Sequence, residues 1–214
     1  GQINARLGYT YERDLDGDGD RFGDPTSRSY ILADGAFKID ENWRWGFAAE
    51  RTSDDLLFDK YDISDVYNQR GLMPSDDLRL TSQVYAVRQD DRSWLSVSAL
   101  SIQGLRPIDN DRAFPTIAPL IEGRWEPEGP VLGGRLRLQG SAVALTREQS
   151  QFVAAQPGTD SRRVSALADW RDTWTFANGL RVSPFAQVRA DVYGLDELPP
   201  PGPADDTVSR AVGV

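Results

Sequence analysis

Residues 180–192 read LRVSPFAQVRADV and alternate between two kinds of side chain. The even-numbered positions carry apolar residues, and the odd-numbered positions carry polar or charged residues, with Phe185 as the exception. Successive side chains of a β-strand point to opposite faces of the sheet, so a period of two predicts a strand with one apolar face and one polar face.

The same alternation recurs along the chain and predicts about ten strands. It is clearest after Ile3 and after Trp43, and no segment has the period of a helix. The expected strands are 3–12, 30–39, 43–50, 78–89, 94–103, 116–126, 135–147, 163–174, 180–192 and one that begins near residue 207. The sequence therefore predicts an all-β protein.

The connections between these strands alternate between short and long. The short ones are 40–42, 90–93, 127–134 and 177–179, and the long ones are 14–28, 53–77, 106–115, 148–161 and 194–206. This order is typical of an antiparallel up-and-down meander with its long loops at one end. Strands of about ten residues exceed the ~5–6 that are common in soluble sheets and match the ~9–11 that cross a bilayer at a tilt. The pattern predicts a segment of a transmembrane β-barrel.

Tryptophan placement supports a membrane sheet. Trp43 and Trp94 directly follow short turns, while Trp125 and Trp174 closely precede them. Indole rings at one end of a barrel form an interfacial girdle, with the ring in hydrocarbon and the N–H toward headgroups or water. Core aromatics of a soluble sandwich are the alternative, but they do not explain the clustering at one end.

The free-energy cost of burying charge in lipid predicts which face of the sheet lines the lumen and which contacts the bilayer. An Arg on the lipid side of a barrel costs roughly 2–4 kcal/mol at the bilayer midplane, so we expect the Arg-bearing face to line the lumen. So many long polar side chains require a wide, wet lumen and hence more than ten strands. The phases of 78–89 and 94–103 are less regular than the others. The predicted lumen-facing residues are Arg6, Arg44, Glu50, Arg79, Gln83, Glu122, Arg124, Arg137, Gln139, Arg163, Asp169, Arg171, Arg181, Gln187, Arg189 and Asp191.

Composition excludes most enzyme chemistry. The 214 residues include no Cys and no His, which excludes disulfides, thiolate zinc sites and catalysis by imidazole. No catalytic residues are predicted, and the protein is not expected to be an enzyme. No apolar run approaches the ~18–20 residues of a membrane helix. The net charge of -9 argues against nucleic acid as a partner.

One motif suggests a metal. Residues 14–20 read DLDGDGD and place Asp14, Asp16, Asp18 and Asp20 at alternate positions, as in calcium loops. Pro25 stands where such a loop has a bidentate Glu. A solvated acidic hairpin loop is the simpler interpretation, so we expect weak calcium binding or none, and no other cofactor.

Several segments, taken in order, resemble the barrel domain of the LptD family, the LPS-assembly or organic solvent tolerance proteins. Residues 43–62 read WRWGFAAERTSDDLLFDKYD and resemble a lumen strand that runs into a loop of the S-D-D type. The succeeding segments 101–107, 119–122, 131–136 and 144–148 resemble later parts of the same domain. The resemblance spans about residues 43–193, and the order of its segments is more specific than any single motif.

The resemblance implies a translocon that inserts lipopolysaccharide (LPS) into the outer leaflet of the cell outer membrane. It implies LPS, an LptE-like plug lipoprotein, periplasmic LPS bridge proteins and outer-membrane lipids as partners. Residues 1–214 would form part of a single barrel domain, with the jellyroll and the closing strands lying elsewhere. The chain begins at Gly1 without a leader, and we expect it to be a fragment or a processed product.

Two other functions fit the same residues. A general or substrate-specific outer-membrane porin shares every compositional feature and is separated only by the ordered segments. A soluble secreted β-protein that binds carbohydrate, with residues 14–20 as a calcium loop, is the other alternative.

Overall fold

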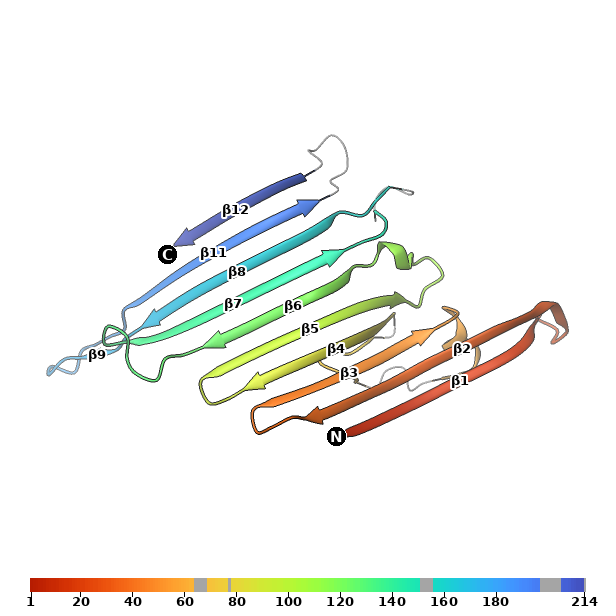
Figure 1. The fold of residues 1–214 in the computed structure, drawn as a ribbon, viewed down its shortest axis with the longest axis horizontal. Coiled ribbons are helices and arrows are strands. Elements are labelled where there is room, and N and C mark those ends of the chain that lie inside the picture. Colours follow the sequence, from red (N-terminus) through yellow and green to blue (C-terminus); the bar gives the residue numbers. More distant parts are fainter. Residues whose placement is uncertain (64–68, 77, 151–155, 197–204, 214) are drawn as a thin grey trace.

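The computed structural model describes residues 1–63, 69–76, 78–150, 156–196 and 205–213. Ten strands form one antiparallel sheet in chain order, which confirms the all-β up-and-down meander (Figure 1). These strands are β1 (Gln2–Leu15), β2 (Arg21–Lys38), β3 (Trp43–Thr52), β4 (Arg79–Gln89), β5 (Ser93–Gly104), β6 (Thr116–Trp125), β7 (Arg135–Thr146), β8 (Asp160–Arg171), β11 (Phe185–Asp196) and β12 (Asp205–Gly213).

The described strands do not close into a barrel. β1 and β12 lie at opposite margins of the sheet, each with a single strand neighbour (Figure 1). The connections 39–42, 90–92 and 126–134 lie at one end of the strands, the short-turn end, and the connection 105–115 lies at the other. Two connections depart from the predicted division, since 172–184 at the short-turn end is long and 16–20 at the opposite end is a tight turn. Within the described residues, none of the helices has the length and apolar character needed to traverse a membrane.

The strand predicted over 180–192 is interrupted. β9 (Trp174–Thr175) and β10 (Arg181–Val182) form a separate two-stranded sheet, and pairing with β8 begins only at Phe185. Pro184 has no N–H to donate to a ladder, so the alternation continues across a break in the hydrogen bonding. The prediction that Arg181 lies in the main sheet is therefore wrong.

The loop predicted over 14–28 is largely strand. β1 runs to Leu15 and β2 begins at Arg21, so only a tight turn separates them, and this hairpin reaches beyond β3 (Figure 1). Its outer part lacks an apolar face, which is why alternation did not reveal it. The backbone ladder and the Arg28–Asp14 ion pair join the two strands there.

Two short helical turns lie in the long connections. α1 (Leu57–Lys60) follows β3, and the 3-10 helix η2 (Asp111–Ala113) follows β5. The sequence did not predict either one, because a single turn is too short to show a helical period.

Candidate functional site

Cross-strand register shows which side chains share a face of the sheet. Arg6 is paired with Leu32, and Leu32 with Glu50, so these three lie on one face. Residues directly opposite each other in a ladder point the same way, and the ladders continue this face across the sheet. We call it the polar face. Of the predicted lumen-facing residues, all but Arg181 lie on it, namely Arg6, Arg44, Glu50, Arg79, Gln83, Glu122, Arg124, Arg137, Gln139, Arg163, Asp169, Arg171, Gln187, Arg189 and Asp191.

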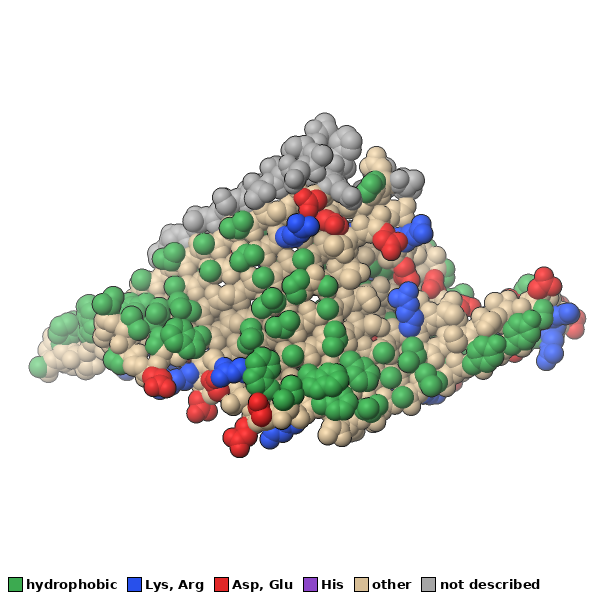
Figure 2. All heavy atoms as spheres, in the orientation of Figure 1, with side chains coloured by type: hydrophobic (Ala, Val, Ile, Leu, Met, Phe, Trp, Pro, Cys, Tyr) green, Lys and Arg blue, Asp and Glu red, His purple; other side chains and the backbone are tan. Residues whose placement is uncertain are grey.

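The opposite face, which we call the apolar face, exposes large hydrophobic side chains from β1 to β11. Figure 2 views a face of the sheet on which hydrophobic side chains spread over the strands and charged ones gather toward the margins. The exposed members are Ile3, Leu7, Tyr9, Tyr11, Ile31, Trp45, Val84, Val97, Trp125, Val164, Val188 and Val192. Apolar exposure this continuous marks a surface that contacts lipid or another apolar body rather than water.

The tryptophans divide between the two faces. Trp43 and Trp125 lie at the short-turn end of the apolar face, where a girdle was expected. Trp94 pairs with Arg124 and therefore lies on the polar face, so its assignment to the girdle is wrong. Trp174 lies outside the main sheet, in β9.

The connection after β3 folds onto the polar face. The Arg70 guanidinium donates to the Glu50 carboxylate at 3.2 Å and lies 4.0 Å from Asp34. The other Glu50 carboxylate oxygen accepts from the Ser75 hydroxyl and from the backbone N–H of Thr81. Glu50 is only 1% exposed, so this segment covers a charge that would otherwise face the open side of the sheet.

Gln83 holds the next part of the same connection. Its side-chain oxygen accepts from the backbone N–H groups of Leu72 and Met73 at 2.8 and 3.0 Å. Gly71 has a φ of 71°, and a Cβ there would lie 2.4 Å from the Gln83 side chain. Glycine permits both the backbone conformation and this close approach.

Apolar packing lies beside these contacts. Leu57 and Phe58 of α1 pack with Leu32 of the polar face and with Leu80, which lies on β4 beyond the end of its ladder with β3. These four residues form a cluster of buried hydrophobic side chains in the described part of the chain. Leu32 interrupts the polar pattern of β2, and the structure gives the reason, since α1 covers it.

The β3–β4 ladder ends early, and side chains replace its hydrogen bonds. Register pairing stops at Ala48 and Gln83. Beyond that point the Ser82 hydroxyl bonds to both the backbone N–H and the carbonyl of Glu50. The Gln103 amide does the same for Thr52, at 3.0 and 2.8 Å. The backbone groups of β3 are thus satisfied without a neighbouring strand.

Two neighbouring acidic residues at the loop end, Asp54 and Asp55, have opposite pKa shifts. Asp54 accepts from Arg28 at 2.8 Å, and this hydrogen bond lowers the pKa of the Asp54 carboxyl. The pKa of Asp55 is raised, mainly by burial and secondly by the nearby Asp111 carboxylate.

The acidic segment 14–20 is not arranged as a metal cradle. The Asp14 carboxylate binds Arg28 at 2.6 Å and Lys60 at 2.9 Å. The Asp16 carboxylate accepts from the backbone N–H groups of Asp18 and Asp20 at 3.0 and 2.8 Å. No group of three acidic or other metal-binding side chains in the described residues is placed to hold an ion.

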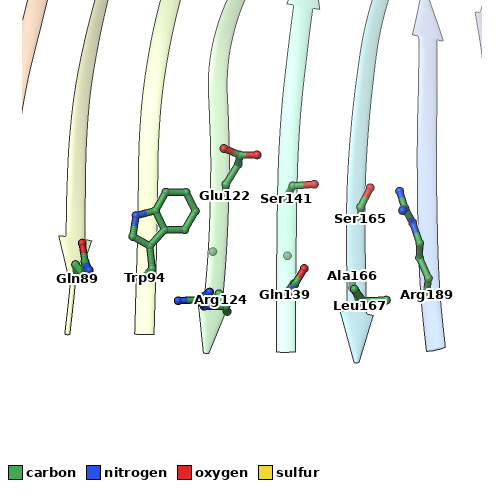
Figure 3. A pocket seen from close by; sticks show the side chains of 12 residues that line it. Gln89, Trp94, Glu122, Arg124, Gln139, Ser141, Ser165, Ala166, Leu167 and Arg189 are labelled. Atoms are coloured by element: carbon green, nitrogen blue, oxygen red, sulfur yellow. The ribbon is translucent and has the colours of Figure 1, made fainter. Parts of the chain in front are cut away.

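A trough lies on the polar face toward the short-turn end. Figure 3 shows its labelled side chains on six neighbouring strands, from Gln89 on β4 to Arg189 on β11. The cavity has a volume of about 590 Å³ and is lined mainly by polar groups. Its size falls within the roughly 300–1,000 Å³ of ligand pockets.

Sequence reasoning placed the strand residues but missed Arg70 and Ser75. Both lie in a connection, where no periodicity signals a direction. The only hint was the partner, Glu50, a carboxylate on the face predicted to be polar.

Comparison with protein-family models identifies a family for this chain. The family model described as "LptD: LPS transport system D" matches residues 26–214, which is most of the chain. A search of curated proteins finds no match.

Proposed function

Since this chain belongs to the LptD family of outer-membrane LPS transport proteins, we propose that its sheet forms part of the barrel wall through which LPS reaches the outer leaflet. The polar face lines the lumen, and the apolar face contacts the hydrocarbon of the outer membrane.

The observation that supports this most is the division of side chains between the faces. Arginines on β1, β3, β4, β6, β7, β8 and β11 share one face, and exposed valines and aromatic residues share the other. Arg51, Arg88 and Arg162 also lie on the apolar face, but near the ends of their strands. The reverse orientation would place a larger number of arginines in lipid, at roughly 2–4 kcal/mol each near the midplane.

The open edges favour a barrel larger than this sheet. In hydrocarbon, each unpaired backbone N–H or C=O costs several kcal/mol, so β1 and β12 need partner strands. We propose that residues 1–214 form part of a single outer-membrane barrel domain and that other strands close it.

Binding and conduction, not catalysis, is the proposed mechanism. The sugars and phosphates of LPS pass along the polar face, while its acyl chains remain with the bilayer. We propose an LptE-like lipoprotein inside the lumen, periplasmic bridge proteins that deliver LPS at the short-turn end, and outer-membrane lipids around the apolar face.

Depletion of the full-length protein tests this role. We expect LPS that antibodies can reach on intact cells to fall, while total LPS in lysed cells is maintained. Re-expression of the intact gene restores surface LPS and is the control.

The porin alternative makes the opposite prediction. If depletion slows uptake of small hydrophilic solutes and leaves surface LPS unchanged, the chain conducts solutes and the LPS role is wrong.

A further inference from the structure

The trough on the polar face is built from residues in one cross-strand row. Trp94 pairs with Arg124, Arg124 with Gln139, Gln139 with Leu167, and Leu167 with Arg189. Figure 3 shows these side chains at similar heights on β5, β6, β7, β8 and β11. They therefore form one continuous strip across the sheet.

Hydroxyl and carboxylate groups border this strip on its loop side. Glu122 pairs with Ser141, and Ser141 with Ser165, in the next row of the same face. All three line the trough with the strip. The trough thus offers both donors and acceptors beside its two arginines.

Arg124 is the cation of the trough that is free to bind a ligand. It is exposed and makes no side-chain hydrogen bond or ion pair with the described residues. The charges nearer the short turns are already paired, since Arg137 binds Glu126 at 2.7 Å and Arg171 binds Asp169 at 2.8 Å. Arg189 binds Asp191 at 2.8 Å and is 53% exposed, so part of its guanidinium remains accessible.

Trp94 supplies a flat apolar surface within this polar strip. It lies next to Arg124 on the neighbouring strand and is partly exposed. An indole ring covers apolar C–H groups while leaving polar neighbours free to form hydrogen bonds. A sugar ring presents that combination, with C–H groups on its faces and hydroxyls at its edge.

We propose that this trough binds the phosphorylated sugar portion of LPS, with Trp94 against a sugar ring and Arg124 on a phosphate. The assignment rests on the proposed function and identifies where on the polar face the glycan is held. Arg189 lies three strands from Arg124, roughly 14 Å away at the usual strand spacing, and contacts a second anionic group. Gln139 and Ser141 bond to the hydroxyls between them.

The chemistry of the lining favours a glycan over a protein plug. Protein–protein interfaces are enriched in Trp and Arg, as this trough is, but they are depleted in Ser and Glu. The trough adds Glu122, Ser141 and Ser165 to its Trp and Arg side chains, and these hydroxyl and carboxylate groups suit the hydroxyls of a sugar. A plug protein in the trough is the alternative that the experiment distinguishes.

The test is site-specific photocrosslinking in cells that produce the full-length protein. A benzophenone amino acid replaces Gln139 in the strip, and the control replaces Leu138, which lies next to it on the apolar face. We expect the Gln139 position to crosslink to LPS, detected with an LPS antibody as a shifted band. We expect the Leu138 position to crosslink to phospholipid, detected by a radiolabelled headgroup.

Substitutions then connect the crosslink to the named residues. We expect Trp94→Ala and Arg124→Ala each to lower the LPS yield at Gln139 about three- to tenfold, the size of effect of one ordinary hydrogen bond or one aromatic contact. Trp94→Tyr and Arg124→Lys should retain most of the yield. Arg51→Ala is the control for loss of a positive charge, because Arg51 lies on the apolar face at the loop end of β3, away from the trough. Yields are normalised to heat-modifiable protein in the outer membrane, so a variant that fails to assemble is not counted as one that fails to bind.

Three results would overturn the proposal. These are a Gln139 crosslink to a protein, a Gln139 crosslink to phospholipid instead of LPS, and an LPS yield that Trp94→Ala and Arg124→Ala leave unchanged. Any of them can occur while depletion still abolishes surface LPS, in which case the LPS role stands and only this binding site is wrong.

Discussion

Glu50 holds the connection between β3 and β4 against the polar face of the sheet. Its carboxylate is buried and accepts from Arg70, Ser75 and the Thr81 backbone. Removing one partner of a buried ion pair costs about 3–5 kcal/mol because the other charge is left uncompensated. We expect Glu50→Ala to increase the population with residues 69–76 released by a factor of roughly 100 or more.

Tryptic cleavage after Arg70 in the detergent-solubilised full-length protein measures this release. Glu41→Ala, in the exposed turn between β2 and β3, is the matched control. Equal cleavage rates in the two variants would show that Glu50 does not hold the connection.

Asp90 makes the turn between β4 and β5 sensitive to acid. The Ser93 hydroxyl and the backbone N–H of Arg92 donate to its carboxylate and lower its pKa to about 2. A pKa below the ordinary 3.8 means that the stabilisation is complete above about pH 4 and is lost as pH falls through about 2. We expect the stability difference between wild type and Asp90→Asn to be constant from pH 7 to about 4 and to shrink below that. Urea unfolding of the full-length protein in lipid vesicles at each pH measures it, and a difference that persists at pH 2 would contradict the assignment.

Asp14 and Asp16 already have partners, so calcium binding at residues 14–20 would require their release. The Asp14 carboxylate forms ion pairs with the side chains of Arg28 and Lys60, and the Asp16 carboxylate accepts from the backbone N–H of Asp20 in the turn. We expect a calcium dissociation constant weaker than about 10 μM, the weak limit of EF-hand sensors. Calorimetry on the full-length protein measures it, and tighter binding that Asp16→Asn abolishes would reverse this conclusion.

Single residues were predictable where a period of two fixes their direction. Arg163 and Arg189 lie on the polar face for that reason. Arg181 has the same phase but lies across Pro184, where the ladder is absent. Periodicity reports direction along a continuous strand and says nothing of whether the strand is continuous.

At the level of elements, the two faces of β8 and β11 give a direct test. Arg163 and Val164 are adjacent on β8 and point to opposite faces, as do Arg189 and Val188 on β11. In proteoliposomes of the full-length protein, we expect cysteines at the arginine positions to react with a water-soluble maleimide. Cysteines at the valine positions should react with a lipid-dissolved one, and the reversed pattern would mean that the apolar face lines the lumen.

Strand order was predictable from the alternation of short and long connections, because an antiparallel meander needs no other information. The ends of the strands could not be predicted in the same way. The β1–β2 hairpin extends through residues predicted to be a loop, because its outer part contacts the connection after β3 through ion pairs such as Arg28–Asp54 and needs no alternating apolar face. The trough was missed as a unit, since its residues come from six strands and only register places them in one row.

At the level of the whole molecule, the open sheet makes the isolated chain incomplete. β1 and β12 each leave a row of backbone groups without a strand partner in the described sheet. We expect residues 1–214 refolded alone in detergent micelles to give no heat-modifiable, protease-resistant monomer and no cooperative melt. The full-length protein refolded in parallel is the control. A stable monomer of the isolated chain would indicate a complete small barrel and would remove the physical support for a large translocon.

The shortened ladder between β3 and β4 has a mechanical consequence. Six register pairs join these strands, the fewest between neighbours in the described sheet, against seven between β5 and β6 and eleven between β4 and β5. Where fewer backbone hydrogen bonds join two strands, less free energy is needed to separate them, so we expect the sheet to open first between the ends of β3 and β4. The side chains of Ser82 and Gln103 that bridge this gap can exchange hydrogen-bond partners while the neighbouring ladders stay intact.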